Sequence, residues 1–244
     1  MAVSLRYLIR LWLLCAGLAP LITMAQTAGG GAREFTVLAG GEANWQGVAY
    51  QRTATEAVSL TFANQRRSEV QKAAGGESLV FTREKIDAAT QKPVRVAVAR
   101  AVWPAGVRTV LLVFVPRVTA GTDGIEFDVL AVDDGVEAFP AETFRVVNLT
   151  PVTLLARIGE REAEIKPGVS PVVRLSDVMP KGAAAVSLAL GMQTESGPLT
   201  LYLGPIEARA GSRALALVLP PKIVGSRKVR VNVIAQTVAK PAVK

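Results

Sequence analysis

Apolar and polar residues alternate along most of this chain in short runs typical of β-strands. In Ala57–Phe62 every second residue is apolar, and Val94–Val102 shows the same two-residue period. Gly, Pro and Asp residues separate such runs at intervals typical of β-sandwiches. The pattern predicts strands in Phe35–Leu38, Ala57–Phe62, Ser78–Phe81, Val94–Val102, Arg108–Val115, Ile125–Val132, Thr143–Val147, Val152–Ile158, Arg161–Ile165, Val169–Leu175, Ala184–Leu190, Leu199–Leu203, Arg213–Leu219 and Lys228–Ile234.

Helical signals are weak by comparison. Ser68–Ala74 can form one or two turns and Ser176–Met179 one turn, but no segment carries a long apolar stripe with a 3.6-residue period. The chain is therefore predicted to be all-β.

A nine-residue sequence returns in the second half of the chain. Ala105–Val113 and Ala210–Val218 begin 105 residues apart, and Ala, Gly, Arg, Leu and Val recur in register. Arg108 and Arg213 stand at matched positions before two apolar strands, which favours a structural role such as an ion pair or a turn contact at the start of each strand. The repeat predicts an internal duplication.

The expected fold is two tandem β-sandwich domains of the immunoglobulin-like kind. We predict a signal peptide over residues 1–25, a flexible linker over 26–33, a first domain over 34–138, a second domain over 143–235 and a disordered basic tail over 236–244.

Val110–Val115 is apolar at every position, so both faces of this strand are apolar. A sandwich strand normally buries one face and exposes the other. We therefore expect the other domain, a loop or a partner to cover the outer face, at Leu111, Val113 and Val115. Leu215–Leu219 shows the same character more weakly.

The N-terminus has the pattern of a secretory signal peptide. Arg6 and Arg10 precede the short apolar run Leu11–Ile22, and cleavage is expected after Ala25. A membrane anchor is the alternative, but the strongly apolar run is short for a span. We predict an exported protein, periplasmic or extracellular, with no transmembrane span after cleavage. Cys15 is the single cysteine and is lost with the signal.

The composition excludes several chemistries. The chain has no histidine, and without Cys15 the exported part has no cysteine. This excludes Ser-His-Asp and Cys-His catalysis and ordinary zinc and copper sites. No phosphate-binding loop joins a strand to a helix. We therefore expect no enzyme activity and no cofactor, and we assign no catalytic, metal or ligand-binding residue.

Carboxylates remain as candidate chemistry. The densest acidic group can form turns and solvated surface, a calcium site, or a glycosidase-type pair; its members are Asp123, Glu126, Asp128, Asp133 and Asp134. The first interpretation is preferred because the spacing matches no calcium loop and aromatic residues are few. Glu160, Glu162 and Glu164 indicate an exposed strand whose charges discourage aggregation, with a docking edge as the alternative.

The net charge of +8 raises the question of an anionic partner. Nucleic acid is not expected, because no aromatic residues lie among the basic ones and the chain carries an export signal. Solvated surface charge is preferred over polyanion binding, and Trp45 and Trp103 are interpreted as packing residues. The basic groups are Arg66, Arg67 and Lys72, and then Lys222, Arg227, Lys228 and Arg230.

Several short motifs occur in a consistent order. Phe144–Thr150 opens with Phe-Arg-Val-Val-Asn, Val152–Ile158 leads to a hairpin at a glycine, and Lys166–Gly168 supplies a Pro-Gly turn. With Val132–Asp134 and Phe139–Pro140, these motifs resemble a family of uncharacterised exported bacterial β-sandwich proteins over about half of the chain. The resemblance implies a β-sandwich and no assigned activity. Periplasmic pilus chaperones are similar in architecture, charge and length, without their strand motifs.

The sequence thus predicts an exported, non-enzymatic binding or scaffolding protein of the periplasm or cell envelope, whose partner is another envelope or exported protein. The alternatives are a carboxylate-dependent carbohydrate-active enzyme, a basic polyanion-binding envelope protein and a chaperone-like two-sandwich protein.

Overall fold

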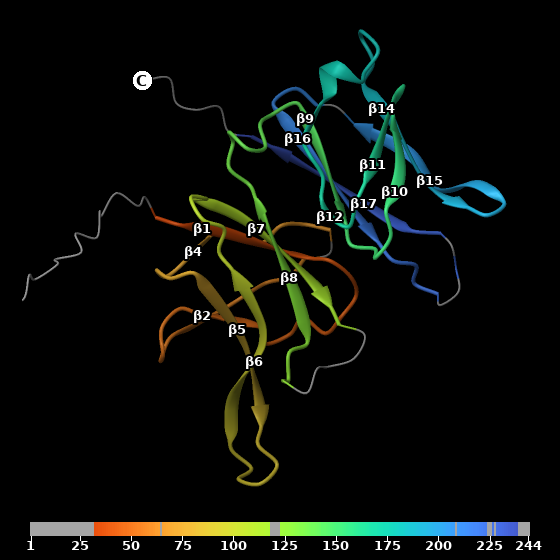
Figure 1. The fold of residues 1–244 in the computed structure, drawn as a ribbon. Coiled ribbons are helices and arrows are strands. Elements are labelled where there is room, and N and C mark those ends of the chain that lie inside the picture. Colours follow the sequence, from red (N-terminus) through yellow and green to blue (C-terminus); the bar gives the residue numbers. More distant parts are fainter. Residues whose placement is uncertain are drawn as a thin grey trace, which may run out of the picture. The chain divides into compact units, whose positions relative to one another are not determined.

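Strands make up nearly all of the regular structure in the computed structural model (Figure 1). The structure describes residues 32–63, 65–117, 123–207, 209–223, 226 and 228–238. Within these ranges the chain is all-β, as predicted. The elements are β1 (Glu34–Ala39), β2 (Ala49–Gln51), β3 (Ala57–Ser59), β4 (Gln71–Lys72), β5 (Ser78–Ile86), β6 (Pro93–Val102), β7 (Thr109–Pro116), β8 (Phe127–Asp133), β9 (Thr143–Asn148), β10 (Leu154–Ile158), β11 (Arg161–Ile165), β12 (Gly168–Val169), β13 (Val173–Arg174), the 3-10 turn η1 (Leu175–Asp177), β14 (Ala185–Thr194), β15 (Gly197–Glu207), β16 (Ser212–Leu219) and β17 (Arg230–Thr237).

The N-terminal half, β1 to β8, forms a sheet of order β3-β2-β5-β6-β8-β7-β1-β4. A bridge between Ala99 and Phe127 is the single ladder pair that joins β6 to β8. Phe81 of β5 packs edge-to-face on Phe114 of β7, with ring centroids 4.8 Å apart. Because β5 and β7 are not neighbours in the sheet, its two flanks face each other across an aromatic core, as in a sandwich.

The C-terminal half, β9 to β17, contains two sheets of order β11-β10-β14-β15 and β12-β9-β16-β17, and β13 also pairs with β9. Phe144, Ile158 and Leu188 lie in one buried core between these sheets. Strand β10 shows the two-residue period directly, since its first, third and fifth residues are buried and the other two are exposed.

Both halves use the same order of strands. The run β3-β2-β5-β6 corresponds to β11-β10-β14-β15, and β8-β7-β1 corresponds to β17-β16-β9. In each half the first strand pairs in parallel with a late strand, β1 with β7 and β9 with β16. That late strand then pairs antiparallel with the last strand of its half. Strands β5 and β14 also each carry a register shift.

A serine plays the same part in the two halves. The Oγ of Ser68 accepts a hydrogen bond from the Val37 amide, and the Ser68 amide donates to the Val37 carbonyl, both at 2.9 Å. Ser170 does the same to Val146, at 3.0 and 2.8 Å. Ser170 lies between β12 and β13, and Ser68 precedes β4. Each serine satisfies the backbone of the first strand in its half.

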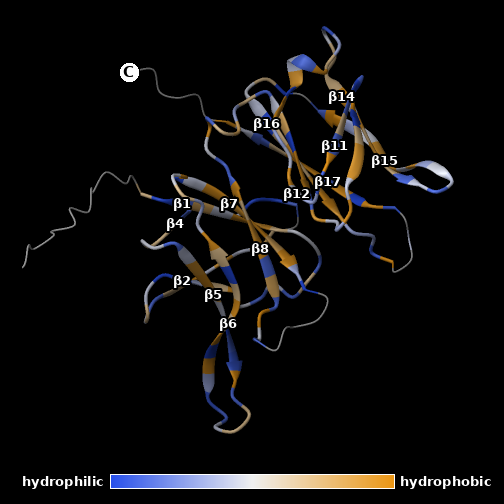
Figure 2. Cartoon of the chain, in the orientation of Figure 1, coloured by the Kyte–Doolittle hydropathy of each residue, from blue (hydrophilic) through white to orange (hydrophobic). Residues whose placement is uncertain are grey.

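The outer faces of β1, β7 and β8 meet those of β9, β16 and β17 in a third apolar cluster, which we name the seam; its hydrophobic strands can be followed in Figure 2. Leu111 and Val113 are fully buried there and Val115 is partly buried. The expectation that the other half covers the outer face of this strand is therefore confirmed. The seam consists of Leu38, Leu111, Val113, Val132, Phe139, Val147, Leu215, Leu217 and Ile234.

The two matched arginines do not play matched roles. Arg213 is buried with 4% exposure, whereas Arg108 is exposed. The reason is a shift of one residue: the turns correspond at an offset of 105, but Phe35 lies opposite Val110 while Phe144 lies opposite Ala214. A shift of one residue in a strand moves a side chain to the other face. The predicted ion pair at the start of the strand is present for Arg213 alone of the two.

Two local predictions need correction. The helical turns predicted over 68–74 are wrong, because Gln71 and Lys72 form β4 and pair with β1. Gln236 and Thr237, which were predicted to belong to the tail, lie in β17 instead. The edge-strand pairing, which joins residues far apart in sequence, overrides the weak local helical signal.

The signal peptide, most of the linker, part of the Gly121–Gly124 turn and residues 239–244 lie outside the described residues. Residues 31–244 cluster as one unit. In the part of the chain that the structure describes, no helix has the length and apolarity needed to cross a membrane.

Candidate functional site

The acidic residues near the end of the N-terminal half do not form a common site. Arg117 lies 2.7 Å from Asp128 and 3.6 Å from Asp123, and these contacts raise the pKa of Arg117, chiefly through Asp128. Glu126 instead pairs with the two basic residues of β5, Arg83 and Lys85. Across the described ranges, no three acidic side chains are placed so that they could hold a metal ion.

Asp134 belongs to a separate buried cluster. Its carboxylate is 5% exposed and pairs with Arg67 of the N-terminal half and with Arg213 of the C-terminal half, the latter at 3.0 Å. Arg213 also donates to the carbonyls of Asp134 and Phe139. We name this group, with Arg145, the arginine cluster.

The arginine cluster holds the connection between β8 and β9. Arg145 donates to the carbonyls of Asp133 and Ala138, both at 2.9 Å. The Phe139 ring lies 4.9 Å from the Arg145 guanidinium and 4.7 Å from that of Arg213. Burial lowers the pKa of both arginines. Arg213 also donates to the Gln236 side chain of β17, at 3.0 and 2.8 Å. Because the hydrogen bonds of these buried arginines go to the connection, to Asp134 or to β17, the cluster fixes the two halves to each other.

The tryptophans pack as expected. Trp103 is 4% exposed and donates from Nε1 to the Val107 carbonyl. Trp45 stacks between Phe62 and Phe127, with centroids 4.7 and 4.9 Å away. Since both faces of its ring are covered, Trp45 offers no platform for a sugar, although it lines a cleft of about 510 Å³ between the halves.

The basic groups are partly used inside the protein. Arg67 is in the arginine cluster, while Lys222 and Arg230 lie 2.9 and 3.5 Å from Glu42 of the other half. The Lys222 contact is the main cause of the lowered pKa of Glu42. Arg227 lies outside the described residues.

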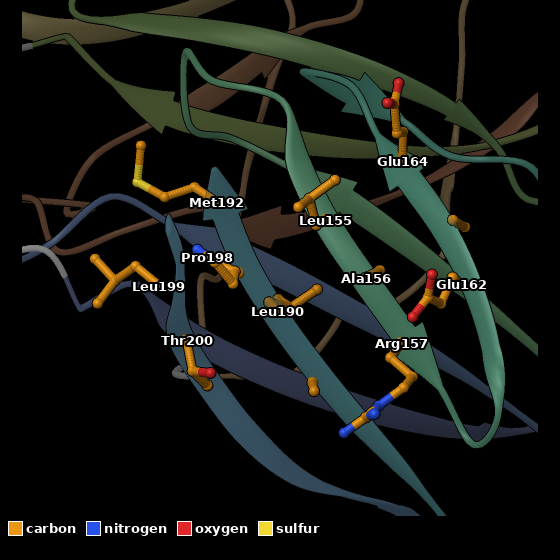
Figure 3. A pocket seen from close by; sticks show the side chains of 13 residues that line it. Leu155, Ala156, Arg157, Glu162, Glu164, Leu190, Met192, Pro198, Leu199 and Thr200 are labelled. Atoms are coloured by element: carbon orange, nitrogen blue, oxygen red, sulfur yellow. The ribbon is translucent and has the colours of Figure 1, made fainter. Parts of the chain in front are cut away.

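A hollow of about 470 Å³ lies over the outer face of the sheet β11-β10-β14-β15 and is the best candidate site (Figure 3). Leu155 and Arg157 of β10 project on one side, with Glu162 and Glu164 of β11 beyond them. Pro198, Leu199 and Thr200 of β15 stand on the other side, and Met192 of β14 lies next to them.

The hollow follows from small residues in β14 and from a bulge at Leu201 in the facing strand β15. Ala189 and Gly191 lie between the two walls, and the β14–β15 register shifts between Leu190 and Gly191. A Cβ at Gly191 would stand 2.8 Å from the Leu199 carbonyl oxygen, so the bulge requires glycine. A strand side chain larger than alanine at these positions would fill the hollow.

The walls combine apolar and charged groups. Leu155 is 40% exposed and pairs across the strands with Glu164, while Arg157 pairs with Glu162. Both glutamates are exposed on the edge strand, whereas a carboxyl acting as general acid near neutral pH needs an apolar or like-charged setting. The arrangement suits binding of an amphipathic chain segment better than bond cleavage.

The sequence indicated the charged residues that line the hollow but not the apolar ones. The alternating Glu160, Glu162 and Glu164 marked β11 as a charged strand, and the β10–β11 hairpin at Gly159 forms as predicted. Leu155, Met192 and Leu199 were missed because, in sequence, they read as ordinary strand residues. The β15 bulge opposite Leu190 and Gly191 leaves no local signal in the sequence beyond Gly191.

Comparison with known proteins did not identify a family for this chain. No family model matches the chain, and no curated protein matches it.

Proposed function

We propose that this chain is an exported, non-enzymatic binding or scaffolding protein of the periplasm or cell envelope. The observation that carries the proposal is the open hollow on the outer face of β11-β10-β14-β15, with apolar side chains beside two exposed glutamates. Binding sites are concave and mostly apolar, with a few polar groups that fix orientation.

The proposed partner is another exported or envelope protein, which presents an extended segment with a basic residue beside aliphatic ones. Glu162 and Glu164 project from the same strand, and the basic residue opposes them. Leu155 supplies exposed apolar contact, while Met192 and Leu199, which also pack against the core of this half, border the hollow. Charge complementarity of this kind selects the partner more than it adds affinity.

We further propose that the two halves are tandem immunoglobulin-like domains, 34–138 and 143–235, which arose by duplication. The shared strand order and the Ser68 and Ser170 contacts support this proposal. The repeated turns do so too, because Gly106 and Gly211 have φ angles of 75° and 70°, a region that favours glycine.

The alternatives receive less support. A carbohydrate-active enzyme needs converging acids, one with a raised pKa; the described carboxyls with a resolved shift, Glu42 and Asp87, have lowered pKa values. A polyanion-binding protein needs free basic groups on one face, yet Arg67, Lys222 and Arg230 pair with acids. A chaperone-like protein would share the architecture. The photocrosslinking experiment described next also tests for its contact with a partner.

Site-specific photocrosslinking tests the proposed binding. A photoreactive amino acid replaces Leu155 or Thr200 in the full-length protein, in cells that export it, and Val70, which is 59% exposed, serves as the control position. We expect an adduct with an exported protein at 155 and 200, not at 70, and a crosslinked segment that contains Lys or Arg beside aliphatic residues.

Charge reversal tests the chemistry of the wall. Glu162→Lys with Glu164→Lys should abolish the adducts, while Glu195→Lys, an exposed change in the β14–β15 turn, should preserve them. Adducts that survive the double reversal, or that join a polysaccharide or an acidic segment, would refute the proposed partner.

The mature protein in the same cells should begin at Gln26; a mature N-terminus at Met1 would contradict export by signal cleavage.

A further inference from the structure

The seam brings together equivalent positions of the two halves. In the N-terminal half Leu111 lies opposite Val132, and in the C-terminal half Leu215 lies opposite Ile234. The strand order assigns β7 to β16 and β8 to β17. Leu111 corresponds to Leu215 because each lies opposite the residue that follows Phe35 or Phe144. Ile234 then takes the place of Val132.

The other seam positions correspond in the same way. Val113 and Leu217 each lie two residues further along their strands and are both fully buried. Leu38 follows Phe35 by three residues, as Val147 follows Phe144, and both lie in the seam. Four positions of one half and the same four positions of the other thus lie together in one buried cluster.

A surface that packs on its own equivalent forms an isologous interface, the kind found in two-fold dimers. We infer that the seam is such an interface, and that it pairs one unit with a copy of itself within a single chain. The inference goes beyond the proposed binding function, because the seam lies on other sheet faces than the hollow over β11-β10-β14-β15. The partner that the seam face of either half fits is therefore an equivalent half, including one from a second copy of this chain.

If the seam is such an interface, the two halves should stay associated even when the connection between β8 and β9 is cut. The buried contacts of the connection are made by Asp134 and Phe139, whereas Val136 and Glu137 are exposed. A cut between Val136 and Glu137 leaves Asp134 with the N-terminal fragment and Phe139 with the C-terminal fragment. The seam and the arginine cluster can both persist after the cut.

The experiment inserts a specific protease site between Val136 and Glu137 of the full-length protein. After cleavage at micromolar concentration we expect the two fragments to elute together at the mass of the uncut chain. Mixing two cut preparations, one with a tag on its N-terminal fragment, should yield complexes that contain fragments of both. Two separate folded fragments would overturn the inference.

Equivalent substitutions test the symmetry. Leu111→Ala and Leu215→Ala should weaken the association of the fragments by similar factors, each about thirtyfold or more. Leu203→Ala, at an exposed leucine outside the seam, should leave the association unchanged. If a variant fails to reassociate, the urea midpoint of its uncut form supplies the comparison. A large effect at one leucine and none at the other would contradict an isologous seam.

Discussion

At the residue scale, a buried charge centre fixes the chain where one half passes to the other. Asp134 meets two arginines from different halves, while Arg145 and Arg213 hold the carbonyls of the connection. Taking charges out of water costs free energy that such pairing repays only when geometry is complete. The centre is therefore sensitive to the loss of any one partner.

Asp134→Asn should lower the free energy of unfolding by about 3 kcal/mol or more, because Arg67 and Arg213 stay buried without a counter-charge. Arg52→Ala is the control, since its pair with Glu56 is exposed and should contribute less than about 1 kcal/mol. Urea denaturation measures both changes. Equal effects would show that the buried centre adds nothing beyond a surface pair.

The repeated serines make a second prediction at this scale. Ser68→Ala and Ser170→Ala each leave the amide of Val37 or Val146 without its acceptor, at a cost of about 1–2 kcal/mol. The two losses should be alike, and Ser176→Ala at an exposed position should change stability by less than about 0.5 kcal/mol. Thermal unfolding compares the three; a loss in one half alone would break the equivalence.

At the scale of elements, turns and bulges place the strands. The β10–β11 turn at Gly159 is both tight and left-handed, with a φ of 60°, and an added Cβ would clash with the Val178 carbonyl oxygen. The edge strand β15 carries Pro198 and Pro205, which cannot donate to a further strand. We therefore expect partners on the face of this sheet and not along its β15 edge.

Gly159→Ala and Gly211→Ala separate strain from crowding. Both positions have positive φ, so alanine costs about 1–2 kcal/mol at each. Gly211 has open space around it, whereas Gly159 meets backbone, which should add about 1–3 kcal/mol. Urea denaturation of the two variants measures the difference; equal losses would mean that the Gly159 turn yields without cost.

The strands were largely predictable from sequence, because a two-residue period records which face is buried. The seam was predictable only in part. The apolar pattern of Val110–Val115 indicates that the outer face of this strand is covered, but it does not indicate which part of the molecule covers it. The match between Arg108 and Arg213 was misleading. The repeated sequences align at the turns, but the strands that follow are shifted by one residue in their pairing, and this pairing decides which side chains are buried. The hollow depends on a bulge and on pairing between distant strands, which no local pattern records.

At the scale of the whole molecule, the equivalent sheets of the two halves are turned toward each other and closed. The sheet β11-β10-β14-β15 keeps its outer face open, with Leu155 and Leu203 exposed. In this arrangement the repeated parts build the scaffold. The open hollow over this sheet is the part that we propose for binding.

Hydroxyl-radical footprinting of the purified full-length protein tests this arrangement most directly. It compares leucines, whose intrinsic reactivity is the same: Leu203 and Leu155 are 69% and 40% exposed, and Leu111 and Leu215 are 0% and 1% exposed. We predict rapid oxidation of Leu203, slower oxidation of Leu155 and none at Leu111 and Leu215. Oxidation of Leu111 and Leu215 at rates close to that of Leu203 would contradict the closed seam and, with it, this account of the molecule.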